Sequence, residues 1–117
     1  MESAKRSGII HNMVKLAVGV DSVEMLYERQ QTRLFDYHGR RATMAWTARR
    51  PRAHEAVAAG GSMYWVIKNH IVVRQLILGF EMDAAQTPAS WSIILDPGLI
   101  RTLAPPRKAF QGWRYLQ

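Results

Sequence analysis

Met63-Tyr-Trp-Val-Ile-Lys68 and Ile71-Val-Val-Arg-Gln-Leu-Ile-Leu78 are the two stretches that decide the fold class of this chain. Both are rich in β-branched and aromatic residues, and only Asn69 and His70 separate them. They therefore predict a β-hairpin whose second strand continues to Met82. Gly79, inside that second strand, predicts a bulge or bend. Further strands are predicted at the later apolar runs Trp91–Leu95, Leu99–Leu103 and Phe110–Leu116, after a loop around Pro88 and a turn at Asp96-Pro97-Gly98.

The first half of the chain predicts one strand and two helices. Val14, Leu16, Val18 and Val20 occupy alternate positions, which is the period of a strand, and Lys15 lies on the opposite face. Asp21, with Glu24 three residues later, matches a capping box and predicts a helix that ends near Phe35. Arg40–Arg50 has no clean periodicity and predicts an extended loop. Pro51–Ala59 predicts a second short helix, which Gly60-Gly61 ends.

This order of elements predicts an α+β fold with its strands clustered late. We expect a small mixed or antiparallel sheet, or a partly open barrel, with two helices inserted after the first strand. Residues 1–12 are expected to form a flexible extension and residues 13–117 a single α+β domain. The order of elements is similar to that of small RNA-associated barrels of the PUA type. That similarity concerns architecture and does not fix function.

Charge and composition limit the classes of partner and of site. The 117 residues carry a formal net charge of +7, which favours polyanionic partners, nucleic acid first. The chain has no cysteine, which excludes disulfides, thiol catalysis and cysteine-based zinc sites. Its four histidines are scattered without metal-ligand spacing, so neither a metal nor another cofactor is expected. Apolar runs stay well below the ~20 residues of a membrane helix, and no signal peptide is recognisable; we expect a cytoplasmic protein.

Arginine dominates the basic residues, and its planar guanidinium can fork onto phosphate and stack on bases. Interleaved with aromatic rings, it is typical of surfaces that bind RNA or single strands. The candidate binding residues fall in three groups: Arg40, Arg41, Arg49, Arg50 and Arg52 in the predicted loop; Tyr64, Lys68 and Arg74 on one face of the hairpin; and Arg107 and Arg114 near the C-terminus. In the alternative interpretation the loop arginines form a solvated face paired with glutamates, and Phe110, Trp113 and Trp65 pack in the core.

Three functions remain open on this basis. A nucleic-acid-binding module, for RNA or single strands, is the main hypothesis. The alternative is a protein-interaction or self-associating module, because the apolar hairpin and four tryptophans exceed what one thin core needs. A third is an enzyme acting on a nucleotide or modified base, in a cleft between the hairpin and the Arg40–Arg52 segment. No set of residues indicates a catalytic centre, and Asp96 before Pro97 is interpreted as a turn residue.

Several strings occur together in one order: Val18-Gly-Val-Asp-Ser-Val-Glu24, Gly60-Gly-Ser-Met-Tyr-Trp-Val-Ile-Lys68, Val73-Arg-Gln75, Leu95-Asp-Pro97 and Phe110-Gln-Gly-Trp-Arg-Tyr-Leu116. They resemble a bacterial, mostly alphaproteobacterial family catalogued as a domain of unknown function, number 1489 in that series. The resemblance spans about Met13 to Leu116, and residues 1–12 precede the usual opening of the family. It implies no activity, substrate, cofactor or catalytic residue.

Overall fold

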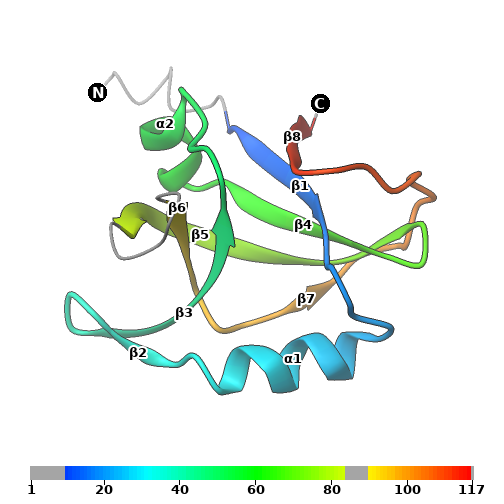
Figure 1. Ribbon diagram of the computed structural model, residues 1–117, viewed down its shortest axis with the longest axis horizontal. Helices are drawn as coiled ribbons and strands as arrows, with labels where there is room; N and C mark the ends of the chain where they lie inside the picture. The colour runs from blue at the N-terminus through cyan, green and yellow to red at the C-terminus, as the bar shows by residue number, and fades with distance from the viewer. Residues whose placement is uncertain (1–9, 84–89, 117) are drawn as a thin grey trace.

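The computed structural model describes residues 10–83 and 90–116 (Figure 1). Within these ranges the chain forms a mixed, open sheet of eight strands with two helices. The elements follow in the order β1 (Asn12–Leu16), α1 (Val23–Gln31), β2 (Phe35–Tyr37), β3 (Arg40–Thr47), α2 (His54–Ala58), β4 (Ser62–Ile67), β5 (His70–Asp83), β6 (Ser90–Leu95), β7 (Ile100–Arg101) and β8 (Trp113–Leu116). The expectation of a mixed sheet is confirmed.

The strands lie side by side in the order β2-β3-β6-β5-β4-β1-β8, and β7 pairs with β5. β1 and β4 run parallel, and every other described pair is antiparallel. β5 is the central strand that connects the two parts of the sheet, because its first half pairs with β4 and its second half pairs with β6. The register shifts between Ile77 and Gly79, which confirms the predicted irregularity at this glycine. A Cβ at position 79 would lie 2.5 Å from the hydroxyl of Tyr37, so the glycine lets β2 come close.

Both faces of the β1–β4 region are buried. The main core fills the inner face with Met13, Met63, Trp65, Val73 and Ile77, and Leu26 of α1 and Val57 of α2 pack against it. A smaller cluster of Val14, Val66 and Ile71 lies on the outer face. Burial of each such aliphatic side chain contributes about 1.5–3 kcal/mol.

α1 begins one residue later and ends earlier than the sequence suggested. Ser22, not Asp21, is the N-cap: its hydroxyl accepts a hydrogen bond from the backbone N–H of Met25 at 3.1 Å. The helix ends at Gln31, and Phe35 already belongs to β2, so the predicted helix end was four residues late. β1 is likewise shorter than predicted: it ends at Leu16, and Gly19 adopts a positive φ of 73°.

The prediction of a loop over Arg40–Arg50 was wrong, because residues 40–47 form β3. His38 and Gly39 have φ angles of 50° and 85° and form the two-residue turn between β2 and β3. Thr43–Thr47 then pair with β6. The strand was hard to recognise in the sequence because buried and exposed residues do not alternate regularly along it. Ala42 and Thr43 are neighbours and are both buried. The two helices are therefore separated by a hairpin.

The central hairpin is confirmed, but its turn lies one residue earlier than predicted. Lys68 and Asn69 have φ angles of 51° and 66°, while His70 pairs with Ile67 as part of β5. The second helix is confirmed within its predicted range, and Gly60 follows it with a φ of 118°. Asp96 is a turn residue, since its carboxylate accepts the backbone N–H of Gly98 at 2.8 Å. Neither described helix has the length and apolar composition needed to cross a membrane.

Two expectations concern segments that are only partly described. Most of the predicted N-terminal extension, residues 1–9, and nearly all of the predicted loop around Pro88 lie outside the described residues. Asn12 is already part of the sheet, because it pairs with Leu116 and its side-chain oxygen accepts the backbone N–H of Ser62 at 2.8 Å.

Candidate functional site

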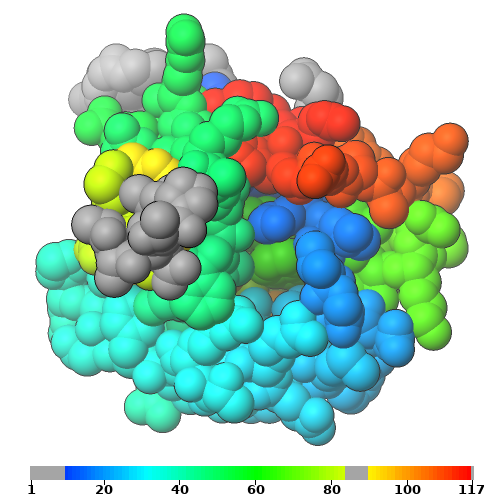
Figure 2. Space-filling view, in the orientation of Figure 1, coloured from blue at the N-terminus to red at the C-terminus, as the bar shows by residue number. Residues whose placement is uncertain are grey.

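Two hollows, of about 110 and 360 Å³, share Lys15, Leu16 and Val18 at the end of β1. We call them together the β1 groove. The first lies between β1, α1 and β3, and its other main lining residues are Arg29, Gln30, Arg33, Ala45, Trp46 and Trp65. The second lies between β1 and the segment 109–112, and includes Phe110. In Figure 2 the surface is hollowed between the blue end of β1, the green β3 and the cyan α1, with the red C-terminal segment above.

Incomplete strand pairing explains why the sheet is open here. β8 pairs with β1 only between Asn12 and Lys15, so the residues after Lys15 have no partner on that side. β2 pairs with β3 only as far as Ala42, and Thr43–Thr47 are bonded to β6 alone. The curled sheet nevertheless brings its two ends together, because the indole N–H of Trp113 in β8 donates to the carbonyl of Arg49, just beyond β3, at 3.0 Å. The groove lies beside this contact.

Lys15 lies between two buried tryptophans. It follows the same alternation as Met13 and Ala17, so it lies on the inner face of the sheet. Its register partners are Trp65 in β4 and Trp113 in β8, each 4% exposed. Burial lowers the pKa of the Lys15 ammonium from its ordinary value. The ion pairs Arg40–Asp96 and Arg101–Glu24 do not involve this amine, and the two hollows that it lines contain no aspartate or glutamate.

Two arginines from α1 and the turn after it line the first hollow. The guanidinium of Arg29 donates to the carbonyls of Val18 and Gly19, at 2.7 and 3.2 Å, and holds the segment after β1 in place. Arg33 lies over the ring of Trp46, 4.5 Å from its centroid, and donates to the carbonyl of Met44 at 3.3 Å. Burial, and then the charge of Arg29, lower the pKa of Arg33.

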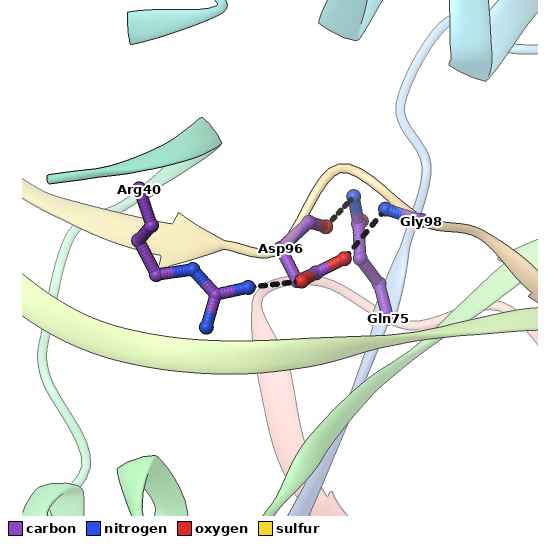
Figure 3. Close-up of polar contacts among 4 residues, drawn as sticks. All are labelled: Arg40, Gln75, Asp96 and Gly98. Carbon is purple, nitrogen blue, oxygen red and sulfur yellow. Dashed lines mark hydrogen bonds and ion pairs between the residues drawn. The ribbon is translucent and has the colours of Figure 1, made fainter. Parts of the chain in front are cut away.

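A buried amide network fixes the floor of the groove. The indole N–H of Trp65 donates to the side-chain oxygen of Gln75 at 3.0 Å. Gln75 and Gln30 exchange two amide hydrogen bonds of 3.0 and 2.7 Å, and Gln75 also donates to the backbone carbonyl of Asp96 at 2.9 Å (Figure 3). With these partners satisfied, the network holds the Trp65 ring in one orientation.

Two arginines stack on Phe110, a ring that lines the second hollow. Arg107 and Arg114 both lie over the ring of Phe110, at 5.2 and 4.9 Å from its centroid. Arg49 lies over Trp113 at 4.4 Å. Arg107 and Arg114 therefore contact a ring that lines the groove, whereas Arg49 contacts Trp113, which lines neither hollow. Neither hollow is lined by an aspartate or a glutamate.

Tyr64 and Arg74 lie on the outer face, away from the floor of the groove. They are register partners, and Val14, beside Tyr64, is in turn paired with Arg114. One row across four strands thus carries Arg114, Tyr64 and Arg74, and Phe110 packs on the apolar cluster beneath it. The expected placement of Tyr64 and Arg74 on one face is confirmed, whereas Lys68 is in the turn and does not belong to that row.

The remaining candidate arginines lie apart from the groove. Arg40 forms an ion pair with Asp96, so its charge is already compensated (Figure 3). Arg41 is paired in register with Asp36 in the hairpin. Arg50 lies over Trp91 at 4.2 Å, and Arg52 lines a separate hollow of about 530 Å³ beside Tyr115. The ten residues proposed from sequence therefore do not form a single surface.

Lys15 was not proposed as a site residue, although the sequence held a signal. It is the only charged residue between Met13 and Val20, and its neighbours of the same parity, Met13 and Ala17, are apolar. The sequence interpretation assigned Val14 and Leu16 to the core face and Lys15 to the opposite, solvent-exposed face. In the structure both faces of this part of the sheet are covered, so Lys15 is half-buried as well. Among the described residues, no group of three metal-ligating side chains is placed to hold a metal ion.

The chain belongs to the family described as protein of unknown function DUF1489, whose sequence profile matches residues 13–117. This match confirms the family resemblance. No curated protein and no solved structure matches the chain.

Proposed function

We propose that this DUF1489 chain is a nucleic-acid-binding module that takes single-stranded nucleic acid, RNA in preference to DNA, along the β1 groove. The observation that supports the proposal most is the composition of the lining. Lys15, Arg29 and Arg33 supply positive charge, Trp46 and Phe110 supply ring surfaces, and no carboxylate opposes them. Positive grooves with stacking rings are how proteins bind unpaired strands.

The Arg33–Trp46 pair is the centre of the proposed site. Trp46 is 40% exposed, so one part of its ring remains open to stack on a base. The stack and the hydrogen bond to Met44 fix the guanidinium of Arg33 before any ligand arrives. A phosphate that binds such a fixed group costs less conformational entropy than one that binds a free side chain.

The proposed path of the strand leads from Trp46 past Lys15 to Phe110. Arg107 and Arg114 on Phe110 would contact the backbone phosphates there. Arg49 lies over Trp113, the register partner of Lys15, and would add a further positive charge. Tyr64 and Arg74 extend the same path onto the outer face. Arg40 is left out of the proposal because its ion pair with Asp96 would have to break first.

Self-association or binding of a protein partner is the alternative, and strand edges are its natural route. The two ends of the sheet are short, since β2 has three residues and β8 has four. Short edge strands offer few free backbone groups to a partner. Light scattering of the purified protein tests self-association, because the nucleic-acid proposal needs only a monomer.

The experiment is a fluorescence anisotropy titration with labelled oligonucleotides of about twelve nucleotides. Single-stranded RNA, single-stranded DNA and duplex DNA are compared at about 50 and 200 mM salt. We expect RNA to bind most tightly, and its affinity to fall steeply with salt as phosphate contacts release counterions. Absence of RNA binding at the lower salt would contradict the proposal.

Three variants locate the site, and two of them, Arg33→Gln and Arg41→Gln, form a matched pair. Trp46→Ala removes the stacking ring and should weaken RNA binding by about fivefold to a hundredfold, since stacking contributes ~1–3 kcal/mol per base. Arg33→Gln removes one groove charge, and Arg41→Gln removes the same charge from the hairpin far along β3. Arg33→Gln should weaken binding several times more than Arg41→Gln. Equal effects would show that only net charge matters and that the groove is not the site.

A further inference from the structure

Lys15 differs from the other described lysines in its surroundings. Lys68 and Lys108 are exposed, whereas Lys15 is half-buried with tryptophans as its partners in both neighbouring strands. It lines both hollows of the groove. The proposed binding of nucleic acid uses only the positive charge of Lys15, and neither that binding nor the packing of the core requires an amine that can lose its proton.

The charged groups around Lys15 are all cationic. β4 and β8 present Trp65 and Trp113, β3 presents Ala45 and Trp46, and the segment 109–112 presents no charged group. From α1 and the turn after it come only Arg29 and Arg33. An ammonium in this place has apolar walls, like-charged neighbours and no carboxylate, which is the environment that activates a lysine as a nucleophile.

We propose that Lys15 is a nucleophilic amine that condenses with an aldehyde or ketone carrying a negatively charged group. The nitrogen of the neutral amine attacks the carbonyl carbon. The carbonyl oxygen then leaves as water, taking up the two protons that the nitrogen loses, and a carbon–nitrogen double bond remains. No oxidant or reductant is needed. Arg33 is the residue that binds the negatively charged group of the substrate, because the guanidinium of Arg29 already donates hydrogen bonds to two backbone carbonyls.

The size of the site agrees with a small molecule. The second hollow, about 360 Å³, is within the ~300–1,000 Å³ range of ligand pockets, and the first hollow, about 110 Å³, is lined by both Lys15 and Arg33. Burial lowers the pKa of Lys15, so a larger fraction of this amine is neutral at a given pH than of an exposed lysine. The inference does not depend on nucleic-acid binding, because the amine and its walls are part of the free protein.

Site-resolved labelling of the intact chain tests the proposal without any variant that could fail to fold. The probe is pyridoxal 5′-phosphate, an aldehyde with a phosphate group, offered at neutral pH and trapped with borohydride. Peptide mass spectrometry then gives the labelled fraction at each lysine. We expect Lys15 to be labelled several-fold faster than Lys68 and Lys108, with a pH profile that rises at lower pH than theirs. Labelling of Lys15 no faster than that of the two exposed lysines would overturn the proposal.

A second arm tests the anionic part of the substrate. Pyridoxal has the same aldehyde without the phosphate, so it measures the reactivity of the amine alone. The preference for Lys15 should be larger with the phosphate than without it, and Arg33→Gln should remove that difference. An equal preference for Lys15 with both probes would overturn the assignment of Arg33 as the anion-binding group. All labelling is done without nucleic acid, so its outcome is independent of the titrations with RNA.

Discussion

Gln75 is the residue on which the floor of the groove depends. Its fully buried side-chain amide forms hydrogen bonds with Trp65, with Gln30 and with the backbone carbonyl of Asp96. These bonds connect β5 to β4, to α1 and to the turn after β6. A glutamine inside an apolar strand is an obvious irregularity in the sequence, but its three partners are up to 45 residues away along the chain. Its role could therefore not be predicted without the fold.

Replacement of this amide tests the network. Gln75→Leu keeps a similar volume but leaves the indole N–H of Trp65 and the amide of Gln30 buried without a partner, so it should destabilise the protein by about 2–3 kcal/mol. Urea unfolding followed by tryptophan fluorescence measures the change. Gln111→Leu, on an exposed glutamine, should change stability by less than about 0.5 kcal/mol. Equal stabilities of the two variants would show that the network contributes nothing.

Lys15 gives a prediction about pH. Because its folded-state pKa is lowered, the unfolded chain binds more protons over the range between the folded and unfolded pKa values. Burial of Lys15 therefore costs stability at neutral pH, and the cost disappears as the pH rises toward the unfolded value of about 10.5. Lys15→Met should raise Tm at about pH 7, and the gain should shrink toward about pH 10. Lys108→Met should show no such pH-dependent gain; a gain from Lys15→Met that is constant with pH would contradict the account.

At the scale of elements, local signals decided which parts could be predicted. The β4–β5 hairpin was recognisable because two long apolar runs are joined by two residues, and α2 because Gly60 ends it. β3 was missed because its arginines and its two successive buried residues hide the alternation. The parallel pairing of β1 with β4 joins segments about fifty residues apart in the sequence. A pattern within a short stretch of sequence cannot predict a contact over that separation.

The turn of the central hairpin supplies a test at this scale. Lys68 has a φ of 51°, a conformation that asparagine tolerates better than lysine. Lys68→Asn should therefore stabilise the hairpin, by about 0.5 kcal/mol. Chemical unfolding measures the gain, and Lys108→Asn, on an exposed lysine, is the matched control. A loss of stability larger than that of the control would show that the Lys68 side chain has a structural role that the turn does not reveal.

At the scale of the molecule, the groove is assembled from five separate parts of the chain: the end of β1, α1 with the turn after it, β3, Trp65 of β4, and the segment 109–112. The sequence correctly indicated that arginines and rings would be interleaved, and five arginines do lie over aromatic rings among the described residues. It could not show which of them converge, because convergence follows from the curl of the sheet around β5. Arg107 and Arg114 meet on one ring, while Arg40 is held by Asp96.

The most direct test of the central claim is an NMR titration of the isotope-labelled protein with a single-stranded RNA. Binding along the β1 groove predicts that the backbone signals of Lys15–Val18 and residues 109–112 shift, together with the indole N–H of Trp46. The signals of the hairpin turn at His38 and Gly39, at the far end of β3, should stay in place. Shifts confined to that hairpin, or no shifts at all at low salt, would contradict the account.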